Sequence, residues 1–348
     1  MKMNRYTQNG CTLSDHWSYN GMQVVWLENE LIKVGVLIGR GADIFEFRYK
    51  PMDVNFLLRL PGEIKNPQTI FAQRRDTGNQ MEDFYYGGWQ DCIPNSAPFV
   101  YKGASYGQHG EAWGIPWKYS IMENSTQIVS VKCWVRPMRT PLLVEKTITL
   151  KIGDPAIYMH SKVTNEGASS FDFIWGQHIA FGLPFLQEGG KIHTNATTIA
   201  SEPSMPEKRR FKPGIETKWP EAQTPDGQLD DASIIPPADQ GSFSELSFLS
   251  GFQKKGFYHL TTPSEDFGIG LEWDAELFKY VWYWQERYGM EGAPWWGKVF
   301  SVALEPWTAR FTSDPLQGIA NGEWELLEGG ASLETEIKAF SIDKTLKK

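Results

Sequence analysis

Residues Glu145–Val163 read EKTITLKIGDPAIYMHSKV, and polar and apolar side chains alternate along both halves of this stretch. Successive side chains of a β-strand point to opposite faces of a sheet, so the alternation predicts two half-buried strands, Glu145–Ile152 and Ala156–Val163. Gly153-Asp154-Pro155 between them is a turn signal. The same period of two covers Glu30–Tyr49. The sequence therefore predicts antiparallel β-structure.

The rest of the chain supports an all-β fold in one domain. No window predicts an amphipathic helix longer than about three turns, and no repeat of about 20–50 residues is present. We expect residues 1–348 to form a single antiparallel β-sandwich with few short helices. Residues 201–242 differ because they contain seven prolines. We expect this Pro-rich segment to be a loop excursion over the face of the sandwich, not an interdomain linker.

Composition excludes several classes of function. The 348 residues include 34 Lys and Arg against 42 Asp and Glu, a net charge of −8, which disfavours binding to nucleic acid. No apolar run approaches the ~18 residues of a membrane span, and the first residues lack the apolar region of a secretory signal. Cys11, Cys92 and Cys133 contain no CxxC pair, so a disulfide framework or cysteine-rich zinc site is not expected. We expect a cytoplasmic protein with no membrane partner; the oligomeric state stays open.

Two of the six histidines and one glutamate occupy unusual positions. His109 lies in YGQHGEAWG and His178 in WGQHIAFG, and glycine near a histidine lets the backbone approach a ligand. Glu305 follows an apolar strand in SVALEPW. A charge at such a place is costly unless it is paired or used. His109, His178 and Glu305 are therefore candidate catalytic residues, although a buried histidine with a satisfied hydrogen bond remains an alternative for each histidine.

Aromatic residues suggest the kind of ligand. The 15 Trp, 13 Tyr and 20 Phe make up 14% of the chain, and most of them are expected in the core. Tryptophan beside polar residues also suits a surface that stacks on sugar rings, and Trp282 and Trp284 share one face of their strand. The candidate substrate-binding residues are Gln90, Asp91, Glu111, Gln177, Trp282, Trp284, Gln285 and Trp296.

The order of these motifs resembles the galactose mutarotase superfamily, also called aldose 1-epimerases. The resemblance lies in His109 followed by glycine, the strand-borne His178, and Ala-Leu-Glu ending at Glu305. Gly39–Ile44 resembles the first hairpin of the family, and Gly87–Asn95 resembles a Gly-Gly…Pro stretch of its divergent branches. The resemblance runs in order from about residue 30 to 340.

The resemblance implies a β-supersandwich and the interconversion of sugar anomers without a cofactor or metal. By resemblance Glu305 is the base, His178 the acid, and His109 a partner that holds a hydroxyl group or stabilises charge. The acid and base are expected on opposite sides of the sugar. The expected partner is a small-molecule carbohydrate, and the sequence does not name it.

Three other classes of function remain open. A carbohydrate-binding protein would use the same aromatic cleft without catalysis. A glycoside hydrolase or lyase needs a second carboxylate, for which Glu111 and Asp91 are candidates. A metal-assisted sugar enzyme could use His109, Glu111, His178 and Glu305 as nitrogen and oxygen ligands.

Overall fold

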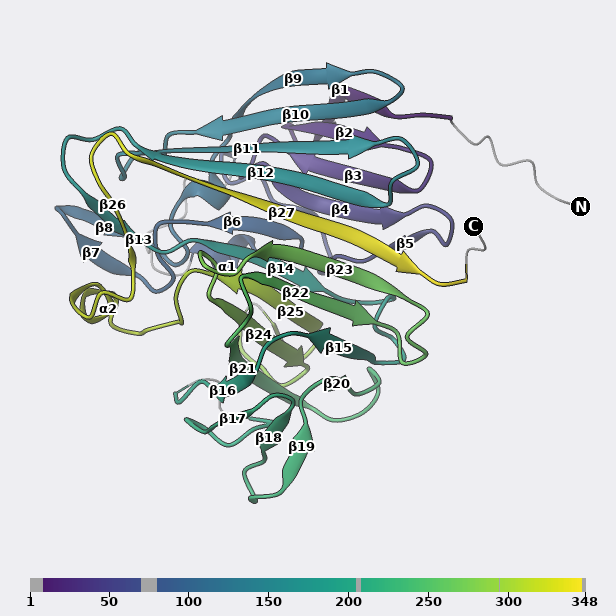
Figure 1. The fold of residues 1–348 in the computed structure, drawn as a ribbon, viewed down its shortest axis with the longest axis vertical. Coiled ribbons are helices and arrows are strands. Elements are labelled where there is room, and N and C mark those ends of the chain that lie inside the picture. Colours follow the sequence, from purple (N-terminus) through teal and green to yellow (C-terminus); the bar gives the residue numbers. More distant parts are fainter. Residues whose placement is uncertain (1–8, 70–79, 205–207, 294, 346–348) are drawn as a thin grey trace, which may run out of the picture.

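A computed structural model describes residues 9–69, 80–204, 208–293 and 295–345, and two large antiparallel sheets dominate it (Figure 1). The predicted all-β sandwich is confirmed. The described residues contain two short α-helices, α1 (Gln80–Phe84) and α2 (Pro315–Ala320). None of the helices in these ranges has the length and apolar character needed to cross a membrane.

The first sheet has twelve strands. Its order is β1 (Thr12–Tyr19), β2 (Met22–Glu28), β3 (Ile32–Leu37), β4 (Asp43–Tyr49), β6 (Trp89–Cys92), β14 (Gly176–Phe181), β25 (Phe300–Trp307), β24 (Tyr280–Arg287), β21 (Phe243–Ser250), β16 (Thr198–Ser201) and β17 (Glu216–Lys218), with β5 (Val54–Asn55) paired to β4. Strands distant in sequence, such as β6, β14 and β25, are therefore neighbours in the middle of this sheet.

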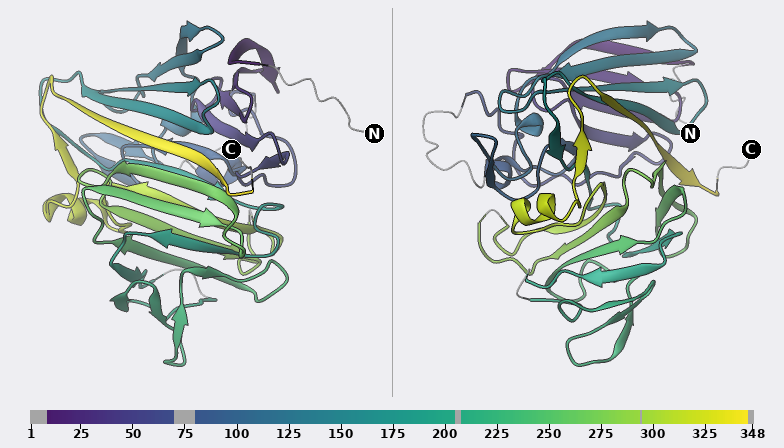
Figure 2. Two further views of the ribbon diagram at one scale, coloured as in Figure 1. Left: turned by 45° about the vertical axis from the view of Figure 1, so that its right-hand side comes forward. Right: turned by 60° about the vertical axis from the view of Figure 1, so that its left-hand side comes forward.

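The second sheet has nine strands and covers one face of the first (Figure 2). Its order is β20 (Ile234–Ile235), β15 (Gly190–Thr194), β22 (Lys255–Thr261), β23 (Phe267–Asp274), β27 (Ser332–Asp343), β12 (Ala156–Asn165), β11 (Leu142–Lys151), β10 (Ile128–Val135) and β9 (Lys118–Asn124). Three two-stranded sheets are β7 (Phe99–Tyr101) with β8 (Ala104–Tyr106), β13 (Phe171–Phe173) with β26 (Glu325–Leu327), and β18 (Glu221–Gln223) with β19 (Leu229–Asp231).

The two strands first predicted from the sequence are β11 and β12, which pair with Ile148 opposite Met159. Val144, Ile148 and Leu150 of β11 are buried in the core between the sheets. Lys146 lies in the same phase of the alternation, so its side chain also points inward. A buried ammonium group needs a partner to offset the loss of hydration.

That partner is Asp91 of β6, which joins the two sheets through a buried ion pair. Lys146 Nζ lies 2.7 Å from Asp91 Oδ2. The other carboxylate oxygen accepts hydrogen bonds from Trp175 Nε1 at 3.1 Å and Gln177 Nε2 at 2.7 Å. Gln177 in turn accepts from Trp89 Nε1 at 2.7 Å. The network satisfies the charges inside the sandwich and attaches β6 and β14 to the second sheet.

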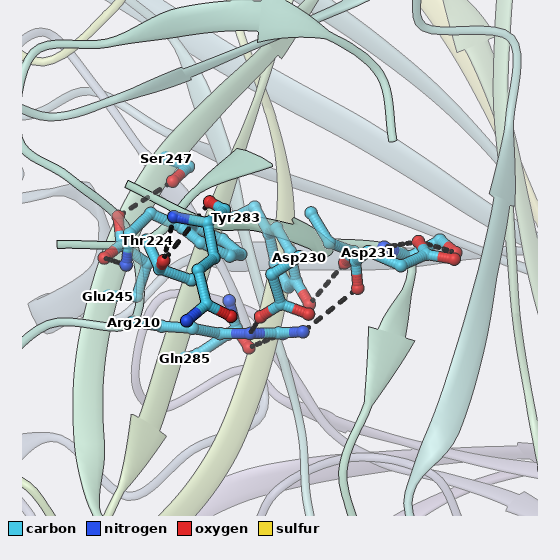
Figure 3. Close-up of polar contacts among 12 residues, drawn as sticks. Arg210, Thr224, Asp230, Asp231, Glu245, Ser247, Tyr283 and Gln285 are labelled. Atoms are coloured by element: carbon cyan, nitrogen blue, oxygen red, sulfur yellow. Dashed lines mark hydrogen bonds and ion pairs between the residues drawn. The ribbon is translucent and has the colours of Figure 1, made fainter. Parts of the chain in front are cut away.

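The Pro-rich segment 201–242 is attached to both large sheets. It supplies β17 to the first sheet and β20 to the second, while the β18–β19 hairpin protrudes from the lower end of the molecule in Figure 1. Arg210 lies between Asp230 and Gln285, with Nε 2.8 Å from Asp230 Oδ2 and Nη1 3.1 Å from Gln285 Oε1 (Figure 3). Buried Glu245 of β21 pairs with Arg209 at 2.9 Å. These contacts fix the segment against β21 and β24.

The buried ion pair gives a test of the fold. In Lys146→Met the Asp91 carboxylate loses its counter-charge inside the core, so we expect the free energy of unfolding to fall by about 3–5 kcal/mol. The double variant with Asp91→Asn should recover part of this loss. Urea denaturation measures both.

The matched control is Lys254→Met, because the side chains of Lys254 and Glu276 are 81% and 63% exposed and their ion pair should contribute only about 0–1 kcal/mol. A Lys146→Met loss no larger than that of the control would show that the buried pair does not stabilise the sandwich.

Candidate active site

Strand pairing brings His178, Glu305 and Trp282 into one row. The register of β14 and β25 pairs Gly176 with Trp307 and Ala180 with Ala303, which places His178 opposite Glu305. On the other side of β25, Glu305 pairs with Trp282 of β24. Directly opposed residues of antiparallel strands share a face of the sheet. The row therefore crosses three adjacent strands.

This row forms the floor of a cleft of about 660 Å³ on the face of the first sheet that points away from the second sheet. Gln177 binds Asp91, the partner of Lys146, and so points toward the second sheet. Side chains alternate along a strand, so the next residue, His178, points to the opposite face. Five predicted residues line the cleft: His109, His178, Trp282, Trp284 and Glu305. A mostly apolar, aromatic cavity with a few polar groups is typical of small-molecule sites.

Glu305 is held in one orientation at the bottom of the cleft. Trp307 Nε1 donates a hydrogen bond to Oε2 at 2.9 Å, and Oε1 lies 3.6 Å from His178 Nε2. The residue is only 3% exposed. Burial raises the pKa of Glu305 to about 8, although the Trp307 hydrogen bond acts in the opposite direction. In the free protein at neutral pH this carboxyl group is therefore protonated.

The two histidines lie beside each other and are uncharged at neutral pH. Their ring centroids are 5.3 Å apart. Burial lowers the pKa of His178 to about 4, and burial together with the nearby His178 lowers the pKa of His109 well below its usual value. Neither Nδ1 atom has a hydrogen-bond partner among the described residues. Both Nδ1 atoms are also buried from solvent.

The backbone geometry of the loop explains why a glycine, Gly110, follows His109. His109 has a positive φ of 61° and Gly110 one of 70°. A Cβ on Gly110 would lie 2.0 Å from the carbonyl oxygen of Ile93, so no other residue fits without displacement of the backbone. The backbone N–H of His109 donates to Ser96 O at 2.8 Å. This tight loop places the His109 ring over the end of β25, 5.4 Å from the ring of Trp307.

Aromatic rings surround His178 and Glu305. Trp282 and Trp307 stack with centroids 4.1 Å apart and planes 13° apart. Tyr85 contacts His178 edge-to-face at 5.3 Å and Trp295 at 5.7 Å. Tyr85, Trp295 and Trp307 were not among the site residues predicted from the sequence. The alternation along β25 could have selected Trp307, two residues after Glu305, whereas no sequence signal marks Tyr85.

Three predicted substrate-binding residues point to the other face of the sheet. Asp91 and Gln177 belong to the network with Lys146 between the two sheets. Gln285 is bound to Arg210 beneath the Pro-rich segment. The sequence neighbours of Asp91, Gln177 and Gln285 face the cleft or lie beside it. Because side chains alternate along a strand, these three residues themselves point away from the cleft. The structure therefore places these three outside the cleft, which corrects the sequence prediction.

Gln90, Glu111 and Trp296 also lie outside the cleft lining. Gln90 is opposite His178, but it is fully buried and donates to Gly87 O at 2.7 Å. The Glu111 carboxylate accepts from the backbone N–H of Arg139 at 2.7 Å, which turns it away. Trp296 is 63% exposed. Gln90, Glu111 and Trp296 are therefore close in sequence to residues of the cleft but do not line it.

The positions of the acidic residues and histidines also concern the metal-assisted enzyme and the glycoside hydrolase considered above. Among the described ranges, no group of three or more His, Cys, Asp or Glu residues is arranged to hold a metal ion. Neither Asp91 nor Glu111 supplies a second carboxylate to the cleft. Glu82 of α1 does line it, and burial raises the pKa of Glu82 while a hydrogen bond from Gln108 opposes that shift.

Several solved structures with a similar architecture are described as aldose 1-epimerase or galactose mutarotase-like proteins. A protein from Klebsiella pneumoniae subsp. pneumoniae, named as a candidate aldose 1-epimerase, is 13% identical with a TM-score of 0.70, over 95% of this chain and 83% of that one. A galactose mutarotase-like protein from Clostridium acetobutylicum is 13% identical with a TM-score of 0.63, over 96% and 99%. A galactose mutarotase related enzyme from Lactobacillus acidophilus is 16% identical with a TM-score of 0.60, over 93% and 99%.

Sequence comparison gives the family. No curated protein sequence matches the chain significantly. The family DUF4432, described as a domain of unknown function, matches residues 19–339, which is nearly the whole chain. The structural neighbours, each below 25% identity, show the fold alone. The chain therefore belongs to the DUF4432 family and has a galactose mutarotase-like fold.

Proposed function

We propose that the protein interconverts the anomers of a reducing sugar by acid–base catalysis, as an aldose 1-epimerase does. The observation that carries this proposal is the opposition of His178 and Glu305, 3.6 Å apart, on the floor of an aromatic cleft. Glu305 is the base for the anomeric hydroxyl group, His178 the acid for the ring oxygen, and His109 holds a hydroxyl group of the sugar.

The reaction requires only two proton transfers and a bond rotation. Glu305 takes the proton of the anomeric hydroxyl group while His178 gives a proton to the ring oxygen, so the C1–O5 bond breaks and an open-chain aldehyde forms. Rotation about C1–C2 exposes the other face of the aldehyde. The reverse transfers close the ring and return both protons, so the groups end as they began.

The burial of both groups determines how many protons they carry. Between the pKa of His178, about 4, and that of Glu305, about 8, the pair holds a single proton. In the free protein this proton is on Glu305, whereas the productive form has it on His178. The two forms differ only in the place of one proton, and the two side chains adjoin each other across paired strands. This adjacency replaces the opposed acid and base expected from the sequence.

A first prediction concerns Glu305→Gln, which preserves the shape of the side chain but removes the proton acceptor. We expect anomer interconversion to fall by about 10²–10⁴-fold, the usual effect of one positioned acid–base group. His178→Asn should cause a similar loss, while His109→Asn should mainly weaken sugar binding. Polarimetry of freshly dissolved single anomers measures the rate.

The control is Glu276→Gln, which changes an exposed carboxylate outside the cleft. Equal rates for Glu305→Gln and the wild type would exclude Glu305 as the base. New reducing ends from a glycoside would instead indicate a hydrolase, and sugar binding without any turnover would indicate a binding protein.

A second prediction concerns pH. Above about pH 8 the His178–Glu305 pair has lost its only proton, so no acid remains and kcat/KM should fall about tenfold per pH unit. Below about pH 4 both groups are protonated, no base remains, and kcat/KM should fall again. We expect a plateau between these values once the spontaneous rate is subtracted. A rate constant that continues to rise above pH 8 would contradict a shared proton.

A third prediction concerns stability and does not depend on activity. The pKa of Glu305 is raised on folding, so its stabilising effect is complete below the ordinary value of 4.5 and is lost as pH rises through about 8. Between pH 4.5 and about 8 this carboxyl group ionises in the unfolded chain but stays protonated in the folded protein, so the free energy of unfolding of the wild type should fall by up to about 5 kcal/mol. Glu305→Gln should lack this loss. Urea denaturation at pH 5 and pH 9 compares them, and identical pH dependence would refute the buried, protonated carboxyl group.

A further inference from the structure

The cleft floor continues beyond the acid–base pair. The register of β21, β24 and β25 places Leu246, Trp284 and Ala303 in the row next to Trp282 and Glu305. Successive rows on one face of a sheet are about 7 Å apart, because each strand rises about 3.3 Å per residue. This second row offers the partly exposed ring of Trp284 beside the small Ala303, a flat surface that can hold another ring.

A third row at the far end is polar. It contains Ser244, Glu286 and Ser301, and both serines line the cleft. Glu286 is buried, accepts a hydrogen bond from Ser244, and accepts from the backbone N–H groups of Gly289 at 2.8 Å and Met290 at 3.1 Å. The carboxylate thus holds the loop that follows β24 against the cleft. Hydrogen bonds within the protein therefore hold the far end of the cleft in place without a ligand.

The walls above these rows combine aromatic and polar groups. Trp295, on the loop after β24, is partly exposed and contacts Tyr85, which itself contacts His178. Trp295 is therefore one ring farther from the acid–base pair than Tyr85 is. Lys208 and Glu291 form an ion pair at the rim and also line the cleft.

We propose that this distal part of the cleft, built by Trp284, Trp295, Ser244 and Ser301, binds a second sugar unit, so that the substrate is a reducing disaccharide or a longer reducing saccharide. Two rows beyond the acid–base pair extend about 13 Å along the strands, more than one pyranose ring requires. Aromatic faces suit the apolar faces of a sugar ring, and the serine hydroxyl groups and rim charges suit its hydroxyl groups. An apolar substituent could form no hydrogen bonds with these polar groups.

The proposal rests on the proposed anomer interconversion, which also fixes where the second unit is attached. The anomeric hydroxyl group at Glu305 must be free, because its proton is removed in the reaction. The second sugar is therefore linked through another oxygen of the reducing unit, such as O4 or O6. Lactose and maltose carry the link at O4, and melibiose and isomaltose carry it at O6.

The test compares kcat/KM for anomer interconversion of glucose and galactose with that of these four disaccharides. For the wild type we expect at least one disaccharide to exceed both monosaccharides by about tenfold. Trp295→Ala should abolish this preference, so that the disaccharide value falls about tenfold more than the monosaccharide values, while Trp295→Phe should keep most of it. The matched control is Trp17→Ala, because Trp17 is 60% exposed on β1, outside the cleft.

Each outcome separates the two proposals. Catalysis of monosaccharides with no disaccharide preference would overturn the distal sugar site and leave the proposed function intact. An equal loss for all sugars in Trp295→Ala would also overturn it. A preference for glucose with a 6-O-benzyl group over every disaccharide would assign the distal part to an apolar substituent. No acceleration of any sugar would instead overturn the proposed function itself.

Discussion

The antiparallel pairing of β14 with β25 is the constraint on which the site depends, because it alone places His178 opposite Glu305. A slip of one residue would turn His178 into the core and Gln177 into the cleft. The buried network below the cleft opposes such a slip, since Gln177 and Trp175 bind the Asp91 carboxylate, which Lys146 of the second sheet holds in turn. The ion pair between the sheets thus fixes the register of the strand that carries His178.

The sequence predicted the sheets well because period-two alternation is a local property. It predicted β11 and β12 and placed Trp282 and Trp284 on one face of β24. It could not say which face of β6, β14 or β24 meets the cleft, because these strands are buried on both faces and their two sets of side chains look alike in sequence. Asp91, Gln177 and Gln285 were misplaced for that reason.

Residues outside the central strands could not be predicted from local patterns. Tyr85 and Trp295 lie in connections, and their contact joins segments about two hundred positions apart in the chain. The charge states also require the structure, because burial separates the pKa values of Glu305 and His178 and leaves one proton on the pair. A carboxylate and a histidine read from sequence alone would be expected to be ionised and partly protonated, respectively.

We propose that the adjoining His178 and Glu305, which share a single proton, interconvert sugar anomers by acid–base catalysis. Two-dimensional exchange NMR of an equilibrated reducing sugar observes this directly, because an exchange peak between the α and β anomeric protons reports each interconversion without any net reaction. We expect enzyme-dependent exchange peaks for at least one sugar near neutral pH, above the spontaneous rate. Exchange no faster than the spontaneous rate for glucose, galactose and their reducing disaccharides would contradict it.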